Sequence, residues 1–227
     1  MSSVFEVDPD SPGASAAALD AASEAVRDGG VVVFPTETVY GIAARPDDPR
    51  ATSALFEAKR RPRSLTLPVL ARTTSDAWQL GQATGPAVAL ARAFWPGPLT
   101  VVVARSARAR DWSLGDRAES IGLRVPDHRL TRSLLERAGP LAATSANMSG
   151  HPPLSDADDL LEAFGDAVDV YLVLAPGLAA PAGVASTVVD LTAEQPRVLR
   201  EGPVGSGDIL AVLAGVQTLG SVPDVTR

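Results

Sequence analysis

Short apolar runs alternate with amphipathic helical segments along most of the chain. The runs have the length and composition of buried strands, and they occupy residues 31–34, 67–70, 99–104, 120–125, 140–145, 168–174, 186–191 and 196–200. Helical spacing, often with capping residues or glycine at the ends, occurs at residues 15–30, 49–59, 86–94, 128–139, 155–165 and 207–214. Together these segments predict an α/β protein.

The order of the segments indicates a mixed sheet with helices packed against it. Predicted strands outnumber the helices between them, and several follow one another directly, whereas a parallel sheet needs a crossover between neighbouring strands. The chain shows no internal repeat and no linker long enough to separate two domains. We therefore expect an N-terminal tail over residues 1–14, one domain over residues 15–205, and a short helix and tail over residues 206–227.

Composition narrows the class of protein. The chain has 227 residues, of which 45% are hydrophobic, enough for a core that needs no cross-links. It has no cysteine, which excludes disulfides and thiolate metal sites. Its sequence shows neither an apolar run long enough to span a bilayer nor a secretory signal. We therefore expect a cytoplasmic protein with no membrane partner.

The charge balance argues against a protein whose main role is to bind nucleic acid backbone. The net charge is −7 and the isoelectric point is about 4.8, whereas backbone binding needs a large cationic face. A local basic pocket is still compatible with this balance. Lys59 is the only lysine beside 19 arginines. Either it lies where an ammonium and a guanidinium are not interchangeable, or a single lysine survives by chance.

The string FPTETVYG, residues 34–41, places polar groups directly after a buried strand. Thr36, Glu37, Thr38 and Tyr40 stand where an apolar strand should be ending. Such a string is either a decorated turn or the mouth of a site.

A second polar cluster lies at the end of the helix predicted over residues 49–59. Pro62 disfavours a helical conformation at Arg61, so the helix should end near Lys59. In an extended segment, Lys59 and Arg61 would point the same way and could form a phosphate clamp. The alternative is a solvated basic helix end that the helix dipole favours.

Further strand ends also carry polar side chains. Ser145 and Asn147 follow a predicted strand; hydroxyl and amide groups there can bind a phosphate, a carboxylate or a nucleobase, although such residues populate any loop. Arg124 ends another strand, where an arginine fork can hold a carboxylate. The last two strand ends carry Ser186 and Arg200.

Taken together, these strings resemble those of the YrdC/TsaC family, the L-threonylcarbamoyladenylate synthases. GGVVVFPTETVYGIAA, FEAKRRP, FWPGPLTVVV, IGLRVPDH, TSANMSG, ASTVVDL and RVLREGP occur in the order and spacing of that family, from about residue 15 to residue 205. The PTETVYG string, the K-x-R and the S-x-N are the most specific. The resemblance, to the short single-domain form, implies an α/β fold with a YrdC-like twisted open mixed sheet and flanking helices around a large concave cavity.

The resemblance also implies a nucleotidyltransferase activity. Such an enzyme combines L-threonine, bicarbonate or CO2 and ATP, with Mg²⁺, into threonylcarbamoyl-AMP and pyrophosphate. A tRNA threonylcarbamoyltransferase complex then forms N6-threonylcarbamoyladenosine in tRNAs that read codons beginning with A, and a weak direct contact with tRNA stays open. The alternative is a non-catalytic RNA-binding module of the same fold, acting on tRNA or ribosomes.

Carried over residue by residue, the resemblance assigns three groups of site residues. The threonine contacts are Thr36, Arg124, Ser145 and Ser186; the ATP contacts are Lys59, Arg61, Ser120, Asn147, Ser155 and Arg200; the catalytic pair is Lys59 and Arg61. The metal ligands stay unassigned. One position departs from the family, because Leu70 stands where many relatives have a substrate-contacting histidine.

Overall fold

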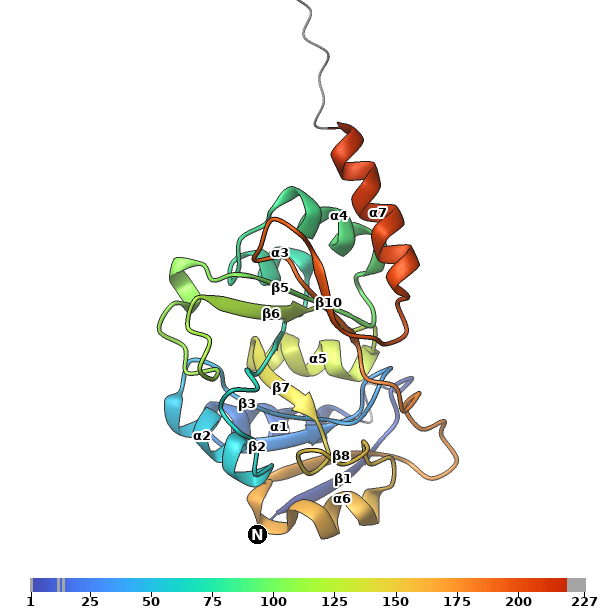
Figure 1. Cartoon of the computed structure of the whole chain (residues 1–227). Coiled ribbons are helices and arrows are strands. Elements are labelled where there is room, and N and C mark those ends of the chain that lie inside the picture. The colour runs from blue at the N-terminus through green and yellow to red at the C-terminus, as the bar shows by residue number, and fades with distance from the viewer. Residues whose placement is uncertain (1, 12, 14, 220–227) are drawn as a thin grey trace, which may run out of the picture.

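The computed structural model describes residues 2–11, 13 and 15–219 and shows a ten-stranded sheet with helices packed against it (Figure 1). In spatial order the strands are β1 (Ser3–Val7), β8 (Val170–Leu174), β2 (Val31–Phe34), β3 (Gly41–Ala44), β7 (Leu141–Ser145), β4 (Val69–Leu70), β6 (Ser120–Arg124), β5 (Leu99–Ala104), β9 (Thr187–Asp190) and β10 (Arg197–Arg200). The pairs β1/β8, β8/β2, β4/β6 and β5/β9 are parallel and the other neighbours are antiparallel. The prediction of a mixed sheet is confirmed.

Seven α-helices are described, and capping residues set the ends of several of them. They are α1 (Ala16–Arg27), α2 (Pro49–Ala58), α3 (Thr74–Trp78), α4 (Gly85–Phe94), α5 (Arg129–Ala138), α6 (Ala157–Phe164) and α7 (Ser206–Leu219). At the start of α2 the Asp48 carboxylate accepts the N–H of Arg50 at 2.8 Å, and Pro49 takes the first helical position, which needs no N–H donor. Gly139, with φ of +82°, ends α5 in a conformation that glycine adopts easily.

Strand β2 is buried on both of its faces. Val31 and Val33 enter a larger core, whereas Val32 and Phe34 enter a smaller one, because successive side chains of a strand point to opposite faces. This double burial explains why the run VVVF is wholly apolar instead of alternating.

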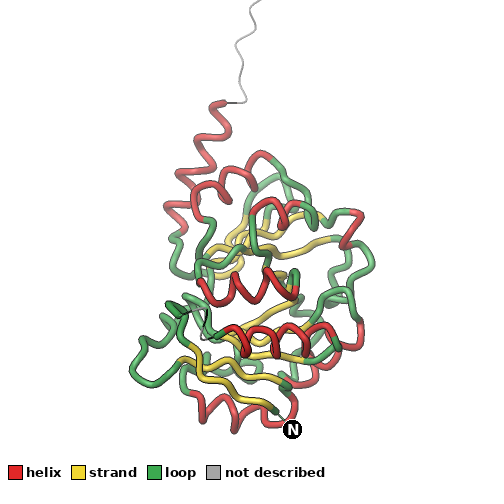
Figure 2. The backbone as a smooth tube through the Cα atoms, turned by 180° about the vertical axis from the view of Figure 1, so that it is seen from behind, coloured by secondary structure: helices red, strands yellow, loops and turns green. Residues whose placement is uncertain are grey.

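Two pairs of helices enclose these cores. Helices α1 and α5 lie side by side on one face of the sheet, in front of the strands in Figure 2, and fill the smaller core with residues such as Leu19 and Leu134. Helices α4 and α7 pack against each other at the upper end of the molecule in Figure 1, and Ile209 and Leu213 of α7 are buried in the larger core. No helix in the described part of the chain is long and apolar enough to cross a bilayer.

Two strands and one α-helix of the described residues are not predicted from the sequence. Strand β1 lies within residues 1–14, the expected tail, and pairs with β8 at the edge of the sheet; strand β3 directly follows FPTETVYG, and the short helix α3 follows β4. The strand predicted over residues 67–70 is reduced to Val69–Leu70, and the last helix is longer than predicted. Residues 220–227 of the expected C-terminal tail lie outside the described residues, as do residues 1, 12 and 14.

Candidate functional site

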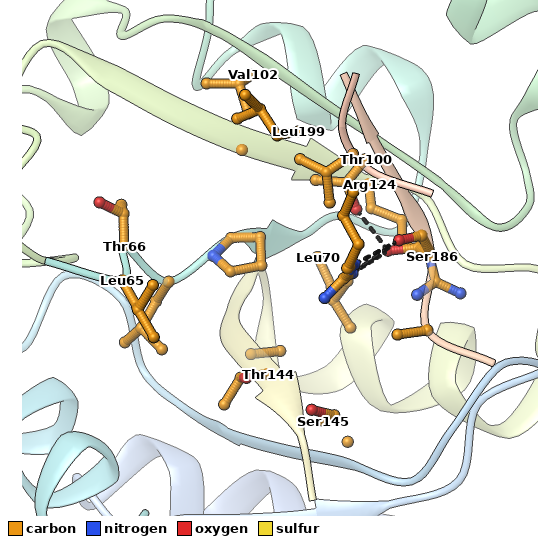
Figure 3. A pocket seen from close by; sticks show the side chains of 18 of the residues that line it. Leu65, Thr66, Leu70, Thr100, Val102, Arg124, Thr144, Ser145, Ser186 and Leu199 are labelled. Atoms are coloured by element: carbon orange, nitrogen blue, oxygen red, sulfur yellow. Dashed lines mark hydrogen bonds between the residues drawn. The ribbon is translucent and has the colours of Figure 1, made fainter. Parts of the chain in front are cut away.

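A cavity of about 310 Å³ lies among the ends of strands from both halves of the sheet. It is lined by parts of β3, β4, β5, β6, β7, β9 and β10 and by the loops near residues 36–39, 61–68 and 185–186. Leu65 and Thr66 lie at one end of it, and Arg124 and Ser186 lie toward the other (Figure 3). Its size is that of a small-molecule site.

The lining brings most of the expected site residues together. Those in the cavity wall are Thr36, Arg61, Ser120, Arg124, Ser145, Ser186 and Arg200. Those outside the wall are Lys59, Asn147 and Ser155. The wall contains four arginines, several hydroxyl groups and an apolar surface, but no Asp or Glu. Such a wall suits an anionic ligand that also has apolar parts.

The PTETVYG string is a turn and also a part of the cavity wall. The hydroxyl oxygen of Thr36 accepts the N–H groups of Thr38 and Val39 at 3.2 and 3.1 Å, and the hydroxyl donates to the carbonyl of Val39 at 2.6 Å. Thr36 is thereby fixed where it lines the cavity. The Tyr40 hydroxyl is engaged elsewhere, since it accepts the N–H of Leu174 at 2.9 Å.

Arg124 is held in place by the same turn. Its Nη2 donates to Glu37 Oε1 at 2.7 Å and to the Thr38 hydroxyl at 2.9 Å, and its Nε donates to the Gly97 carbonyl at 3.1 Å. Its side chain is only 8% exposed. The second nitrogen of the fork, Nη1, donates to no group of the described residues. A buried, oriented fork with one unused nitrogen is suited to a ligand carboxylate.

Arg200, Ser186 and Thr100 form a second fixed group on the cavity wall. The Nε and Nη2 of Arg200 donate to the Ser186 carbonyl at 2.9 and 2.7 Å, and Nη2 also donates to the Ser186 hydroxyl at 3.1 Å. That hydroxyl lies 2.9 Å from the hydroxyl of Thr100. Arg200 thus fixes Ser186 in the loop before β9, and the Ser186 hydroxyl in turn contacts Thr100 of β5.

The cations of the cavity lie close enough to repel one another. Burial lowers the pKa of Arg61, and the charge of Arg200 lowers it further. Burial likewise lowers the pKa of Arg200, with a second contribution from Arg124. Arg61 itself is anchored to the protein by a 2.8 Å bond from its Nε to the Leu65 carbonyl. The fold therefore keeps three neighbouring guanidinium groups together, an arrangement that an anion would relieve.

Lys59 is placed differently from the sequence expectation. Arg60 has a φ of +48°, so residues 59–61 do not form an extended segment, and the argument that Lys59 and Arg61 point the same way is wrong. Lys59 is 1% exposed, and its Nζ donates to the carbonyls of Ser145, at 2.5 Å, and Asn147. Burial, and then the charge of Arg61, lowers the pKa of Lys59 to about 7.

Asn147 and Ser155, the other two expected site residues outside the cavity wall, lie in different surroundings. Asn147 donates from Nδ2 to the carbonyls of Met148 and His151 at 2.8 and 2.7 Å, while its buried Oδ1 has no partner among the described residues. Ser155 is exposed, one residue before the Asp156 cap of α6. The contacts that the family resemblance assigned to both residues stay predictions.

Sequence reasoning missed one charged residue of the wall. Arg117 lines the cavity but belongs to the polar loop over residues 105–119, here called the β5–β6 excursion, which carries no recognisable motif. The same wall does not fit a metal held by the protein alone, because its lining offers hydroxyl and carbonyl oxygens but no carboxylate. Within the residues that the structure describes, no group of three or more His, Asp or Glu side chains could hold a metal ion.

Comparison with known proteins gives consistent matches. Residues 24–202 match the family model Sua5_yciO_yrdC, described as telomere recombination. A Mycobacterium tuberculosis protein, provisionally named threonylcarbamoyl-AMP synthase, is 44% identical to this chain over 191 residues. The match covers 83% of this chain and 86% of that protein. The Bacillus subtilis threonylcarbamoyl-AMP synthase is 34% identical over 200 residues, which cover 86% of this chain and 56% of that protein.

Among solved structures, the fold is similar to that of Pyrococcus abyssi Sua5 complexed with L-threonine. The TM-score is 0.78 and the sequence identity 29%, and the match covers 100% of this chain and 65% of that one. The chain thus spans about two thirds of the length of Sua5.

Proposed function

The chain belongs to the Sua5/YciO/YrdC family, and on this premise we propose that it is a threonylcarbamoyl-AMP synthase. It combines L-threonine, bicarbonate or CO2 and ATP into threonylcarbamoyl-AMP and pyrophosphate. The observation that carries the proposal is the convergence of four arginines on one cavity whose wall contains no carboxylate. All three substrates carry negative groups, and such a wall attracts and orients them.

Threonine binds at the end of the cavity formed by Arg124 and the PTETVYG turn. The Arg124 fork, already oriented by Glu37 at 2.7 Å, takes the substrate carboxylate through its unused nitrogen. Thr36, Ser145 and Ser186 complete this end of the wall. The similar Sua5 structure was solved with L-threonine, which supports an amino acid site in this fold. Leu70, also in the wall, offers only an apolar contact.

ATP occupies the rest of the cavity. Arg61 and Arg200 face its phosphates, and Ser120 contacts the nucleotide from the start of β6. Lys59 acts with Arg61 in the proposed catalytic pair, and its ammonium also holds the loop between Ser145 and Asn147. The family resemblance also assigns Asn147 and Ser155 to ATP, although both lie outside the cavity wall.

The reaction needs positioned charges more than it needs an enzyme nucleophile. The threonine amine and bicarbonate form a carbamate, with loss of water. A carbamate oxygen then attacks the α-phosphorus of ATP, and the bond from that phosphorus to the oxygen bridging the β-phosphate breaks, so that pyrophosphate leaves with the electron pair. Arg61 and Arg200 balance the charge that develops on the leaving group. Holding the reactants together in this way can lower a barrier by roughly 7–11 kcal/mol.

We propose that Mg²⁺ binds together with ATP and not at a separate site of the protein. Since the cavity wall provides no carboxylate, the phosphates would supply the charged ligands of the ion, with serine hydroxyls and water completing its shell. Bound there, the ion would neutralise phosphate charge. The arginines of the wall supply the same kind of neutralisation from the protein itself.

We propose that the product, threonylcarbamoyl-AMP, is used for tRNA modification. A threonylcarbamoyltransferase complex in the cytoplasm receives threonylcarbamoyl-AMP and forms N6-threonylcarbamoyladenosine. A weak direct contact with tRNA is compatible with the net charge of −7 only through a local basic surface, because the chain as a whole repels nucleic acid.

Pyrophosphate release tests this function directly. The assay contains ATP and Mg²⁺ and omits threonine or bicarbonate in turn. We expect full release only when both are present, because the attacking group is the carbamate formed from both. Release at the full rate without threonine would identify an enzyme that simply hydrolyses ATP to AMP and pyrophosphate, and would reject the proposal.

A further inference from the structure

Arg117 is a cavity cation for which no role has been assigned. It lines the cavity with Arg61 and Arg200, yet it comes from the excursion between β5 and β6. Its closest charged partner is Asp190, whose Oδ2 lies 4.0 Å from Nη1, and the Arg117 side chain is 62% exposed. This distance is too long for a hydrogen bond, and an ion pair at this distance with an exposed arginine contributes little. The guanidinium is therefore available to a ligand.

Asp190 does not depend on Arg117. Its Oδ1 accepts the N–H of Thr192 at 2.9 Å and the Thr192 hydroxyl at 2.6 Å, so the turn after β9 holds this carboxylate through Oδ1 without Arg117. An anion in the cavity can replace Asp190 as the partner of Arg117 without breaking a hydrogen bond of the carboxylate, because the two bonds to Oδ1 remain.

The backbone beneath Arg117 is held by a second arginine. Arg105 is only 9% exposed, and its Nη2 donates to the Arg117 carbonyl at 3.0 Å while its Nε donates to the Ser120 carbonyl at 2.8 Å. Its Nη1 donates to the carbonyls of Trp112, at 2.6 Å, and Ala109, at 3.3 Å. The buried Arg105 side chain thus holds the excursion at several points, and it binds the backbone carbonyls of two residues of the cavity wall, Arg117 and Ser120.

We propose that Arg117 binds the triphosphate of ATP and the pyrophosphate that leaves, and that Arg105 is the residue that positions it. The proposal rests on the proposed function and adds a phosphate contact from the β5–β6 excursion to those of Arg61 and Arg200. The Arg117 side chain is 62% exposed, so it is accessible to an entering polyphosphate. An arginine fork matches two phosphate oxygens at once.

Binding of inorganic tripolyphosphate, ATP and L-threonine to Arg117→Ala, measured by calorimetry, tests the contact. We expect tripolyphosphate and ATP to bind about tenfold more weakly or worse, as for the loss of a charge-assisted hydrogen bond, with threonine binding unchanged. The matched control is Arg110→Ala, an exposed arginine of the same excursion that does not line the cavity. Equal affinities for Arg117→Ala and Arg110→Ala would overturn the proposal.

Asp190→Asn tests whether the ligand replaces Asp190 as the partner of Arg117. The amide oxygen can still accept from Thr192, so the turn is preserved, but the competing charge near Arg117 is removed. Tripolyphosphate should bind more tightly than to the wild-type protein. Weaker binding would show that Asp190 supports the site instead of competing with the ligand.

Arg105→Lys tests the positioning role, because an ammonium cannot span the same carbonyls. We expect a loss of tripolyphosphate affinity like that of Arg117→Ala, and no additional loss when the two substitutions are combined, which is the signature of residues that act as one unit. Additive losses, or a variant that does not fold, would assign Arg105 a purely structural role. These measurements record binding alone, so they stand even if pyrophosphate release fails to require threonine and bicarbonate.

Discussion

At the scale of single residues, Arg124 shows how the fold prepares a side chain for its ligand. The sequence suggested a carboxylate-binding fork at the end of a strand. The structure adds Glu37, which orients the fork through a 2.7 Å ion pair and has a buried Oε2 without a hydrogen-bond partner among the described residues. Long-range pairs of this kind cannot be predicted from the local sequence, because 87 positions separate the two residues.

Arg124→Ala should weaken threonine binding much more than ATP binding. Losing a charge-assisted hydrogen bond costs about 1.5–3 kcal/mol, roughly a tenfold or greater rise in the dissociation constant. Calorimetry with each ligand measures the two effects, and Arg72→Ala, which removes an exposed ion pair with Glu136, is the control. Equal losses for both ligands would mean that Arg124 supports the fold only.

Lys59 illustrates where local reasoning failed. The composition correctly drew attention to a solitary lysine, and α2 ends at the residue before it, as predicted. The direction of the side chain was wrong because Arg60 adopts a left-handed conformation, which is uncommon for residues other than glycine and asparagine. The ammonium turns inward to the loop after β7, a contact that the spacing of charges cannot reveal.

The lowered pKa of Lys59 predicts a pH dependence of stability. The folded protein loses this proton near pH 7, whereas an unfolded lysine keeps it up to about 10.5. Between these two pH values the unfolded state binds more protons than the folded state. The free energy of unfolding therefore rises with pH, by up to about 1.4 kcal/mol per pH unit. Below pH 7 both states are protonated and the contribution to the slope vanishes.

Lys59→Met provides the comparison for this slope. Its side chain has a similar length and cannot titrate, so the difference in unfolding free energy between wild type and Lys59→Met should grow from pH 7 to pH 9. Urea unfolding at a series of pH values measures it. Parallel curves for the two proteins would contradict a titration of Lys59 in this range.

At the scale of elements, the long and strongly patterned segments were predictable and the short ones were not. Helix α5 and strand β5 have clear periodicity or continuous apolar runs, and both occur where expected. Strand β3, with the sequence GIAA, has little intrinsic strand preference. It forms because it pairs with β2 and β7, and tertiary pairing of this kind leaves no local signal.

Helix α2 offers a test at this scale, because it carries Lys59 at its end. Asp48 caps its first turn by accepting the N–H groups of Arg50 and Ala51. Asp48→Ala should lower the free energy of unfolding by about 1 kcal/mol, as measured by urea denaturation, and leave the affinity for ATP unchanged. Asp48→Asn, which retains a capping oxygen, should recover most of the stability. A large loss of ATP binding in Asp48→Ala would show that the site depends on the start of the helix.

At the scale of the whole molecule, the distribution of charge is uneven in a way that composition hides. The chain has a net charge of −7, yet one cavity collects four arginines and no carboxylate. The sequence identified three of these arginines through family strings, and it missed Arg117 because that residue lies in a segment without a motif. The guanidinium groups of Arg61, Arg124 and Arg200 repel one another, and a bound anion would offset this repulsion.

Polyphosphates should therefore stabilise the folded protein. A ligand at one hundred times its dissociation constant contributes about 2.7 kcal/mol to stability, which thermal denaturation detects as a higher melting temperature. We expect ATP and pyrophosphate to raise the melting temperature at concentrations where adenosine has a smaller effect. An equal effect of adenosine would locate the binding energy in the base and not in the arginines.

The most direct test of the account is the fate of labelled bicarbonate. The protein is incubated with ATP, Mg²⁺, L-threonine and ¹³C-bicarbonate, and the nucleotide products are analysed by mass spectrometry. The proposed reaction places the labelled carbon between the threonine nitrogen and the phosphate of AMP, so a threonylcarbamoyl-AMP species should carry one ¹³C atom and should disappear when threonine is omitted. Pyrophosphate release without any labelled nucleotide would contradict the proposed function.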